Sequence, residues 1–371
     1  MKVLLTATVQ SHICQFHKPL VEVLHAHGCE VHVAARDNLA EKNGLKLDFV
    51  ERVYNLPFSR SPKSLDNLKA YKELKKIIQK ESYDIIHCNT PMGSIVTRLA
   101  ANKARKNGTK VFYTAHGFHF YKGAPKKNWL IFYPIEKYFS KLTDKVITIT
   151  DEDYTLAKNN FYCTVERIHG VGVDGERYFP IDEKLKSDLK EKMGYTINQK
   201  IILCVGELNK NKNQIMAINA MNDVVKKFPD ALLILAGNGP QKEELEQAII
   251  KYDLQKNVKL IGYVTNLQDY QRIADVAISC SKREGLPLNI VEAMLSGTPV
   301  IATMNRGHKE LIRDGINGFI VDLNDRKVLK NKIIELLDNQ DTYNAISEKA
   351  LDNAKCYTFK NVEKELDKIY F

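Results

Sequence analysis

The sequence lacks any apolar run near the roughly 18 to 20 residues that a membrane-spanning helix needs. Its beginning, MKVLLTAT at residues 1–8, also lacks the longer apolar stretch of a secretory signal peptide. These absences argue against a membrane-spanning or secreted protein. We therefore expect a cytoplasmic protein.

There is also no C-x-x-C pair and no group of histidines and cysteines at the sequence spacing of metal ligands. The seven cysteines are scattered at positions 14, 29, 88, 163, 204, 280 and 356. We interpret them as buried free thiols that behave as small apolar residues. The chain has no short-period repeat and no low-complexity tract. Its 44% apolar and 27% charged residues are those of a folded protein rather than a fibrous or disordered one.

The 371 residues exceed what one hydrophobic core usually holds, so the length indicates two domains. The charge is divided unevenly. Residues 1–180 contain 27 Lys and Arg against 18 Asp and Glu, a net +9, whereas residues 181–371 contain 28 against 27, a net +1. The first half is therefore expected to face something anionic, a membrane surface or a phosphorylated ligand; an ordinary solubilising surface is the alternative.

Both halves alternate short β-branched runs with segments of helical length, which is typical of a parallel sheet with crossover helices. The expected strands begin near residues 2, 30, 84, 110 and 145, and near 200, 231, 257, 275 and 298. The glycine-rich segment HGVGVDGERYFP at 169–180 reads as a linker. We expect an α/β protein with two Rossmann-like domains, residues 1–176 and 177–355, and a C-terminal helix at 356–371 that packs back on the first domain.

In open parallel sheets, ligands bind beyond the carboxyl ends of the strands, where turns lead into helix N-termini. One such turn opens the segment REGLPLNIVEAMLSGTPVIA, residues 283–302. A helix is expected to begin near Pro287, because proline suits the first helical position. The residues whose backbone would contact a diphosphate there, without a metal, are Gly285, Leu286, Pro287 and Leu288.

Two carboxylates, Glu284 and Glu292, flank this turn. Because like charges repel, they would not bind phosphate, but they can accept hydrogen bonds from hydroxyls on either side of it. A diphosphate with a polyhydroxylated group on each side is a nucleotide sugar. The alternative is that Glu284 is an ordinary acid at a helix terminus and Glu292 a surface acid.

Two further strand-to-helix turns support the first interpretation. VGELNKNKNQ at 205–214 contains a glycine and two lysines that could reach a phosphate, and AGNGPQ at 236–241 contains glycines that let backbone approach a ligand closely. The candidate donor-binding residues in these turns are Gly206, Glu207, Lys210, Lys212, Asn238 and Gly239.

These motifs, together with ELIRDGINGF at 310–319, resemble the nucleotide-binding domain of the family 4 retaining glycosyltransferases. The spacing of Glu284 and Glu292 matches the E-x7-E motif of that family. The resemblance spans both halves and is strongest in residues 200–325. It implies a GT-B fold, with two Rossmann-like open parallel-sheet domains facing a central cleft, a nucleotide-diphosphate sugar donor and no metal requirement.

The resemblance also implies roles. Glu284 would contact the donor sugar, Glu292 the ribose hydroxyls and Lys212 the donor phosphates. The backbone near Tyr263 and Val264 would recognise the base. One departure stands out: the family usually has G-R-L where this chain has G-E-L at 206–208, so either Lys210 compensates for the missing arginine or Glu207 has another role.

The first half offers fewer candidates. TATVQSHICQFH at 6–17 lacks the glycine pair that many family members have after the first strand, and it leaves Ser11 and His12 as candidates for an acceptor or phosphate loop. By resemblance His116, at the end of the strand near 110, would contact the donor sugar. A structural histidine is the alternative.

Two other segments of the first half carry chemistry-bearing residues. The Asp151-Glu-Asp153 sequence fits a metal-binding D-x-D only superficially, and we interpret it as acids at a helix start. Residues 117–139 hold eight of the 32 aromatic residues, interleaved with lysines. This pattern favours an amphipathic surface that docks on an anionic membrane, with a buried helix as the alternative.

We therefore predict a retaining glycosyltransferase with His116, Glu284 and Lys212 as its catalytic residues. It would move a sugar from a nucleotide-diphosphate donor, with UDP expected, to a lipid-linked glycan in cell-surface polysaccharide assembly, at the inner face of the cell membrane. No metal, other cofactor or nucleic acid is expected. The alternatives are a non-catalytic GT-B partner subunit of a glycosyltransferase complex and a nucleotide-sugar 2-epimerase.

Overall fold

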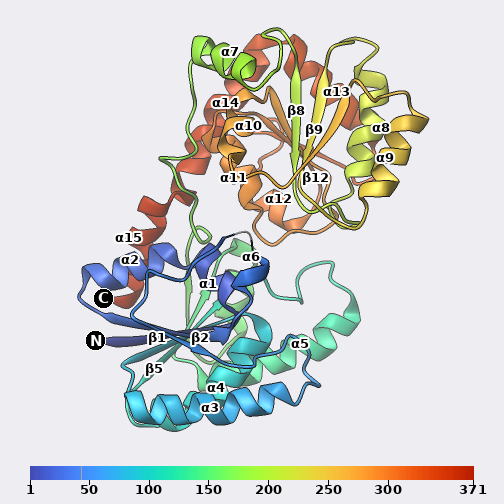
Figure 1. Cartoon of the computed structure of the whole chain (residues 1–371). Coiled ribbons are helices and arrows are strands. Elements are labelled where there is room, and N and C mark those ends of the chain that lie inside the picture. The colour runs from blue at the N-terminus through green and yellow to red at the C-terminus, as the bar shows by residue number, and fades with distance from the viewer. Residues whose placement is uncertain (43) are drawn as a thin grey trace. The chain divides into compact units, whose positions relative to one another are not determined.

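Two separate parallel sheets organise the chain, and Figure 1 shows each of them flanked by helices. The structure is a computed structural model that describes residues 1–42 and 44–371. Unit 1 comprises Met1–Gly172 and Phe359–Phe371, and unit 2 comprises Val173–Thr358. The predicted α/β class with two Rossmann-like parallel sheets is confirmed.

The sheet of unit 1 has seven strands in the order β3-β2-β1-β4-β5-β6-β7, and neighbouring strands are parallel. Its central strands β1 and β4 are buried except at Lys2, the first residue of β1, as the β-branched runs predict. The strands are β1 Lys2–Val9, β2 Glu30–Arg36, β3 Arg52–Asn55, β4 Ile85–Asn89, β5 Lys110–Ala115, β6 Lys145–Thr148 and β7 Thr164–Arg167.

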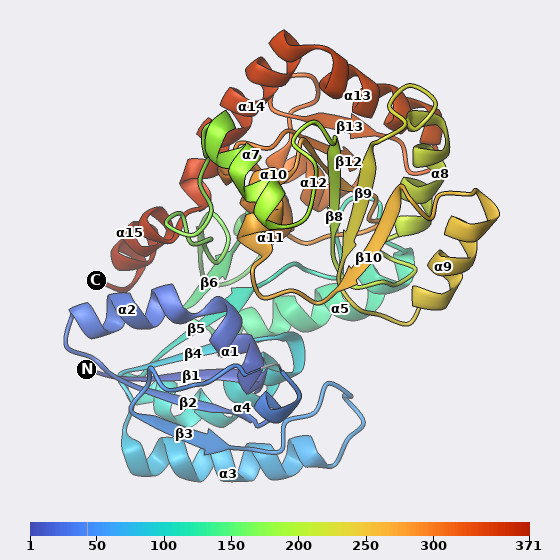
Figure 2. The ribbon, with the colours of Figure 1, turned by 45° about the horizontal axis from the view of Figure 1, so that its top comes forward.

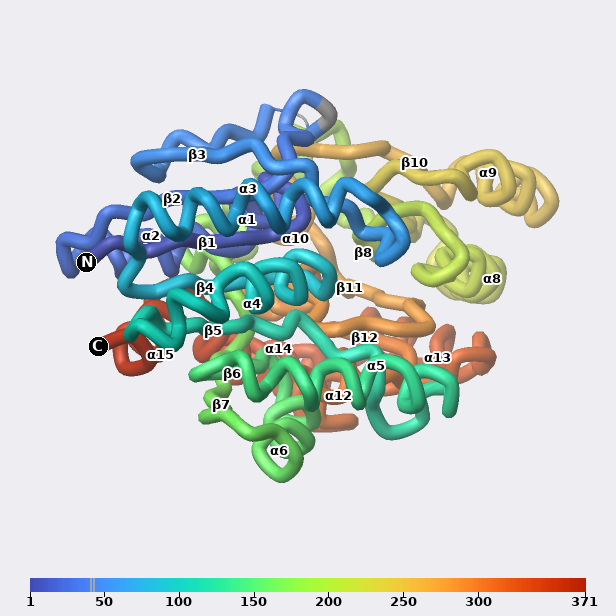
Figure 3. Tube along the Cα trace, turned by 90° about the horizontal axis from the view of Figure 1, so that it is seen from below, coloured from blue at the N-terminus to red at the C-terminus, as the bar shows by residue number. Residues whose placement is uncertain are grey.

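Helices cover both faces of this sheet. They are α1 Gln10–Phe16, α2 Lys18–Ala26, α3 Asp66–Glu81, α4 Pro91–Lys106, α5 Lys126–Phe139, α6 Asp151–Asn160 and α15 Phe359–Tyr370, with 3-10 turns η1 Leu39–Glu41 and η2 Ser140–Leu142. Figure 3 shows α3 and α4 side by side across one face, where they share a core with Ile86 and Val111. The C-terminal α15 contacts α2, and its Tyr370 packs on Phe112, which points to the opposite face because side chains alternate along a strand.

Unit 2 repeats the plan with six parallel strands in the order β10-β9-β8-β11-β12-β13, all of which except β11 are labelled in Figure 2. The strands are β8 Ile201–Val205, β9 Leu232–Ala236, β10 Val258–Gly262, β11 Val276–Ser279, β12 Val300–Thr303 and β13 Phe319–Val321. The helices are α7 Glu183–Lys192, α8 Gln214–Val224, α9 Lys242–Lys251, α10 Leu267–Ile273, α11 Leu288–Leu295, α12 Arg306–Leu311, α13 Arg326–Asp338 and α14 Gln340–Ala354, followed by the 3-10 turn η3 Lys355–Tyr357. Within the described residues, no helix combines the length and the apolar character that crossing a bilayer requires.

Three strands were not predicted from the sequence: β3, β7 and β13. Each is an edge strand of three or four residues, and in β3 and β7 most side chains are not buried. Without two buried faces a strand carries no continuous apolar run, so its sequence does not differ from that of a loop.

The strand orders place one topological switch point in each sheet. The order reverses between β1 and β4 in unit 1, and between β8 and β11 in unit 2. Ligands of open α/β sheets bind at the carboxyl ends of the strands at such points. The turns after β1 and β4, and those after β8 and β11, are therefore where a site is expected.

Candidate active site

In unit 2, the turn after β8 brings a lysine back over the end of its own strand. Gly206 has a φ of 149°, which residues with a side chain rarely adopt. A Cβ on Gly206 would lie only 3.1 Å from Cε of Lys212, so the lysine stem runs across this glycine. Because Gly206 has no side chain, the stem of Lys212 can cross it and reach the switch point between β8 and β11.

Lys212 meets Glu284 there. Its Nζ donates to Oε1 of Glu284 at 2.7 Å, and the two side chains are 22% and 14% exposed. Because the pair is largely shielded from water, salt screens it less than a surface pair. A cation and a carboxylate are thus held side by side at the carboxyl ends of β8 and β11.

Backbone hydrogen bonds fix the two turns to each other. The amide of Lys282 donates to the carbonyl of Asn211 at 2.7 Å, and Nδ2 of Asn211 donates to the carbonyl of Arg283 at 2.9 Å. α11 begins at Leu288 with Pro287 as its N-cap, so the prediction of a helix start near Pro287 is confirmed. The turn from Glu284 to Leu288 therefore leads directly into a helix N-terminus.

Glu292 lies on α11, and its surroundings are unusual for a carboxylate. Burial raises the pKa of Glu292 to about 7, against the opposing effect of a hydrogen bond from Tyr178 and of the nearby Arg177. Such a group does not fit the alternative of an ordinary surface acid. It can exist as a neutral acid or as a carboxylate near neutral pH, depending on which donors surround it.

The turns after β9 and β10 pack against the turn after β8. The amide of Gly237 donates to the carbonyl of Gly262 at 2.7 Å, and a Cβ on Gly239 would lie 2.3 Å from the carbonyl oxygen of Leu208. Asn238 lies between the two glycines. Tyr263, which is 59% exposed, and the half-buried Val264 follow β10 at the same sheet edge.

The structure distinguishes Lys210 from Lys212, which the sequence offered equally as lysines able to reach a phosphate. Lys210 is exposed, whereas Lys212 is paired with Glu284. The side chain of Glu207 is also exposed and accepts a hydrogen bond from Nδ2 of Asn209 at 2.9 Å. Glu207 thus stabilises the turn locally, and Lys212 is the lysine whose side chain lies at the switch point.

Two residues that border Glu284 were missed. A Cβ on Gly307, in α12, would lie 2.4 Å from the carbonyl oxygen of Gly285 and 2.8 Å from Cβ of Glu284, so α12 packs directly on this turn. Next to it His308 is buried, which lowers its pKa to about 4, and its Nε2 lies 3.0 Å from Oγ of Ser279. The glycine at the strand-to-helix turn after β12 was the available signal.

In unit 1, the region after the first strand differs from the loop that we expected over residues 6–17. β1 continues to Val9, and α1 begins at the next residue, Gln10. The expectation of a loop there was wrong, because Val9 extends the buried β-branched run. Ser11, in the first turn of α1, exchanges hydrogen bonds with Asn38: its amide donates to Oδ1 at 3.1 Å and its Oγ accepts from Nδ2 at 2.9 Å.

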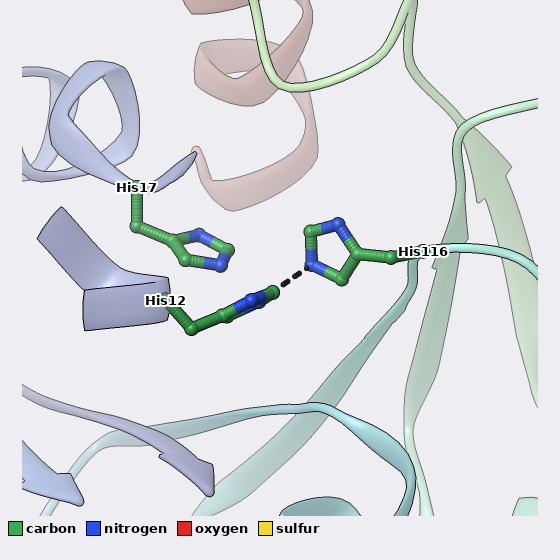
Figure 4. Close-up of side chains that lie close together, drawn as sticks. All are labelled: His12, His17 and His116. Carbon is green, nitrogen blue, oxygen red and sulfur yellow. Dashed lines mark hydrogen bonds between the residues drawn. The ribbon is translucent and has the colours of Figure 1, made fainter. Parts of the chain in front are cut away.

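The other candidates of unit 1 converge. His12 on α1 and His116 after β5 approach to 3.1 Å between their Nε2 atoms, and Figure 4 shows His17 beside them. His87 on β4 packs against His17 with ring centroids 5.9 Å apart. Burial lowers the pKa of all four, to about 4 for His116 and about 3 for His87, so these imidazoles are neutral at pH 7.

A mainly apolar cavity of about 710 Å³ lies beside His12. It is lined by residues of α1, α4 and α5 and by the segment after β5, among them Phe16, Met92, Phe118 and Ile135, with Arg60 at its margin. A larger hollow of about 1320 Å³ surrounds the end of α15 at the amino ends of the strands. Since ligands of open sheets bind at carboxyl ends, the cavity beside His12 is the candidate site.

The aromatic segment is divided between core and surface. Phe118 and Phe120 are buried, and Trp129, Phe132 and Tyr133 pack against them, so the expectation that the aromatic rings as a group face a membrane was wrong. The rings of this segment fill the space beside the sheet edge. The exposed face of α5 is instead an apolar stripe flanked by lysines; it consists of Leu130, Ile131, Pro134 and Tyr138.

The acids at 151–153 begin α6, as predicted. Oδ2 of Asp153 accepts from the amide of Phe118 at 3.2 Å, Oε1 of Glu152 accepts from the amide of Lys122 at 2.6 Å, and Asp151 pairs with Arg167 at 2.8 Å. They anchor the segment that leads to α5.

Two Rossmann-like sheets with candidate residues at both switch points define a GT-B glycosyltransferase. Residues 2–150 match the model of the family described as glycosyl transferase 4-like, and residues 186–352 match that of glycosyl transferases group 1. EpsD of Bacillus subtilis, a protein named as a glycosyltransferase, is 39% identical over 371 residues, which cover 100% of this chain and 96% of EpsD. The chain therefore belongs to the family 4 glycosyltransferases and is a glycosyltransferase.

Two further comparisons extend this result. A protein of Escherichia coli named UDP-Gal:alpha-D-GlcNAc-diphosphoundecaprenol alpha-1,3-galactosyltransferase is 27% identical over 341 residues, covering 89% of this chain and 86% of that protein. The crystal structure of Anabaena HepE in complex with UDP superposes with a TM-score of 0.80 at 21% identity, covering 100% of this chain and 99% of HepE. The second similarity establishes the fold alone.

Proposed function

We propose that the protein is a retaining glycosyltransferase that uses a UDP-linked sugar. The observation that carries the proposal is the pairing of Lys212 with Glu284 at the switch point of unit 2, with Glu292 further along α11. In this proposal Lys212 contacts the diphosphate, Glu284 beside it contacts the sugar, and Glu292 contacts the ribose. The E. coli relative is named for a UDP-sugar and the HepE crystal contains UDP, which supports uridine as the base.

Catalysis in this proposal is mainly electrostatic. Lys212 and the backbone at the start of α11 stabilise the diphosphate as its bond to the anomeric carbon breaks. The acceptor oxygen bonds to that carbon on the same face, and its proton passes to the leaving phosphate oxygen. Glu284 orients the sugar hydroxyls, and the neutral His116 donates or accepts a hydrogen bond without adding charge. No step needs a metal ion.

The acceptor is proposed to be a lipid-linked glycan of cell-surface polysaccharide assembly. The apolar cavity beside His12 suits the first units of a lipid chain, and the exposed Arg60 at its margin suits a phosphate. Ile131 lines the cavity and also belongs to the exposed stripe of α5, which connects the cavity with a surface able to contact lipid. The E. coli relative is named for a diphosphoundecaprenol acceptor, and we propose peripheral binding to the inner face of the membrane.

The test uses purified protein with a panel of UDP- and GDP-sugars, a polyprenyl diphosphate-linked sugar as acceptor, and EDTA throughout. We expect one donor to yield free UDP and an extended lipid-linked product, with the anomeric configuration of the donor retained. Glu284→Gln should abolish the product, while Glu207→Gln, an exposed acid in the facing turn, should keep it.

Each other result contradicts a defined part of the proposal. A product of inverted configuration would exclude the retaining mechanism, and a strict requirement for added Mg²⁺ or Mn²⁺ would exclude the metal-free one. An epimerised nucleotide sugar without transfer would favour the epimerase. Absence of donor binding in a thermal shift assay would favour the non-catalytic partner subunit.

A further inference from the structure

We propose that His12, His17 and His116 form a binding site for a divalent transition metal ion of the zinc type in unit 1. This site could not be inferred from residue spacing, because His12 lies within α1, His17 directly follows α1, and His116 follows β5 about 100 positions later. Only the switch point between β1 and β4 brings the three rings to one place.

The distances suit such a site. One nitrogen of each ring lies within 4.8 Å of one nitrogen of each other ring. In a tetrahedral zinc site with Zn–N bonds of about 2.0–2.1 Å, ligand nitrogens lie about 3.4 Å apart. The 3.1 Å between the Nε2 atoms of His12 and His116 is close to that value, and a bound ion would draw in the ring of His17, whose ligand nitrogen lies within 4.8 Å of both. Figure 4 shows the ring of His17 turned toward the space between the other two.

The hydrogen bonding of the cluster points the same way. His17 is only 3% exposed, and no described residue meets hydrogen-bond geometry with its Nε2, although the side chain of Asn89 lies near enough to offset part of the effect of burial on its pKa. A buried polar nitrogen without a partner is costly, and a bound metal ion would satisfy it. Burial also keeps these imidazoles neutral, which is the form that coordinates a metal.

The fourth histidine is a supporting residue rather than a ligand. Nε2 of His87 bonds Oγ1 of Thr114 at 2.7 Å, and its Nδ1 bonds the hydroxyl of Tyr370, so both of its nitrogens are engaged. In the part of the chain that the structure describes, the three histidines are joined by no fourth ligand. A set of three histidines is typical of an open zinc site, in which water or a substrate atom completes the shell. Because His12 also lines the 710 Å³ cavity, water can reach this position.

A metal here has a functional consequence, which rests on the proposed function. Coordination would occupy His116, the residue proposed to contact the donor sugar. We therefore expect Zn²⁺ to inhibit transfer and EDTA to restore it, so that the metal would regulate the enzyme rather than assist the reaction. Binding itself is independent of the reaction and can be measured without any substrate.

The experiment titrates Co²⁺ alone into metal-stripped, tag-free protein and follows its visible absorption. We expect one equivalent to give the bands of a tetrahedral ion without a sulfur charge-transfer band in the near ultraviolet. His17→Gln, and independently the more exposed His12→Gln, should weaken binding by at least about 10–100-fold, since even changes beyond the first ligand shell cost that much. His25→Gln, which changes an exposed histidine near the other end of α2, is the matched control. It and Cys14→Ser should keep binding, and circular dichroism reports whether each variant is folded.

Three results would overturn the proposal: no saturable binding, unchanged binding in both folded ligand variants, or loss of the signal in Cys14→Ser. If Co²⁺ binds as expected and Zn²⁺ leaves transfer unaffected, the metal site stands and the role of His116 in transfer is wrong. If no transfer is found with any donor, the Co²⁺ titration still decides the metal site by itself.

Discussion

Nζ of Lys212 lies 2.7 Å from Oε1 of Glu284, although 72 positions separate the two residues in the chain. Each neutralises the other while no donor is bound. A diphosphate would take over the lysine and sugar hydroxyls would take over the carboxylate, so the pair keeps both side chains extended into the site. Such preorganisation avoids part of the cost of ordering two flexible groups during binding.

The first prediction separates the two lysines of the turn after β8. Lys212→Met keeps the aliphatic stem over Gly206 but removes the charge, and it should lower kcat/KM by about 10²–10³-fold, as does loss of one preorganised electrostatic contact elsewhere. Lys210→Met, on an exposed neighbour, should change it less than about threefold. Steady-state kinetics measure kcat/KM for both variants. Equal decreases in kcat/KM would show that Lys210 takes the role of the arginine that the family usually has.

The second prediction concerns the proton on Glu292. Its pKa of about 7 lies above the ordinary 4.5, so it stabilises the fold fully below about pH 4.5, and this contribution is lost as the pH rises through 7. If ribose hydroxyls donate to Glu292 they favour the carboxylate, so UDP binding near pH 6 should release a proton. Titration calorimetry in buffers of different ionisation enthalpy measures the number of protons released when UDP binds.

UDP titrates in the same range, so Glu292→Gln is the control for this experiment. In this variant, the protons released on binding should come only from UDP. The difference in proton release between wild type and Glu292→Gln is then the contribution of Glu292. Tyr178→Phe removes a hydrogen-bond donor to Glu292 and should therefore raise the pKa of Glu292 further. More of the free protein is then protonated at pH 7, so UDP binding should release more protons. Identical proton release in wild type and Glu292→Gln would contradict the assignment of Glu292 to the ribose.

The third prediction tests the packing behind Glu284. In Gly307→Ala the new methyl group would lie 2.4 Å from the carbonyl oxygen of Gly285, so the turn must move. We expect a loss of about 1–3 kcal/mol in the free energy of unfolding and a weaker affinity for the donor. Lys309→Ala, an exposed position of the same helix, is the matched control, and an unchanged donor affinity in Gly307→Ala would show that α12 does not position Glu284.

The fourth prediction concerns a buried ion pair next to the cavity of unit 1. Nη2 of the fully buried Arg98 donates to Oε2 of Glu136 at 3.0 Å, and the guanidinium stacks on Tyr113 and Phe139. Glu136→Ala would leave this cation without its counter-charge and should cost about 3–5 kcal/mol. Urea denaturation measures the loss. Glu22→Ala, which breaks an exposed pair with Lys18, should cost no more than about 1 kcal/mol.

The fifth prediction tests the stripe on α5. A double change of Leu130 and Ile131 to Glu adds two negative charges to exposed apolar positions and should abolish sedimentation with vesicles that contain anionic lipid, because it removes apolar contact and adds repulsion. Leu185→Glu, on an exposed leucine of unit 2, should leave sedimentation unchanged. Equal binding of the α5 variant and the wild type would exclude this surface.

The sequence pattern was sufficient to predict those parts of the structure that depend on residues close together in the chain. Buried β-branched runs such as β1 and β4 identified the parallel sheets, and the spacing of Glu284 and Glu292 around Pro287 identified a strand, turn and helix with two carboxylates. The edge strands β3 and β7 were missed because exposed strands carry no such run, and β13 was missed because its apolar run is only three residues long. The aromatic rings of residues 117–139 were misplaced because composition does not say which side of a helix faces the sheet.

By itself, the sequence determined the α/β class, the two sheets, the family and the two carboxylates on either side of the turn before α11, since each depends on residues that are neighbours in the chain. Only the tertiary structure decided which of two lysines meets Glu284, that Gly307 lies against it, that Glu292 is partly buried beside Tyr178, and that three histidines converge in unit 1. The physical reason is the order of the strands. It brings distant turns together at a switch point, and burial there then sets the charge of the groups that meet.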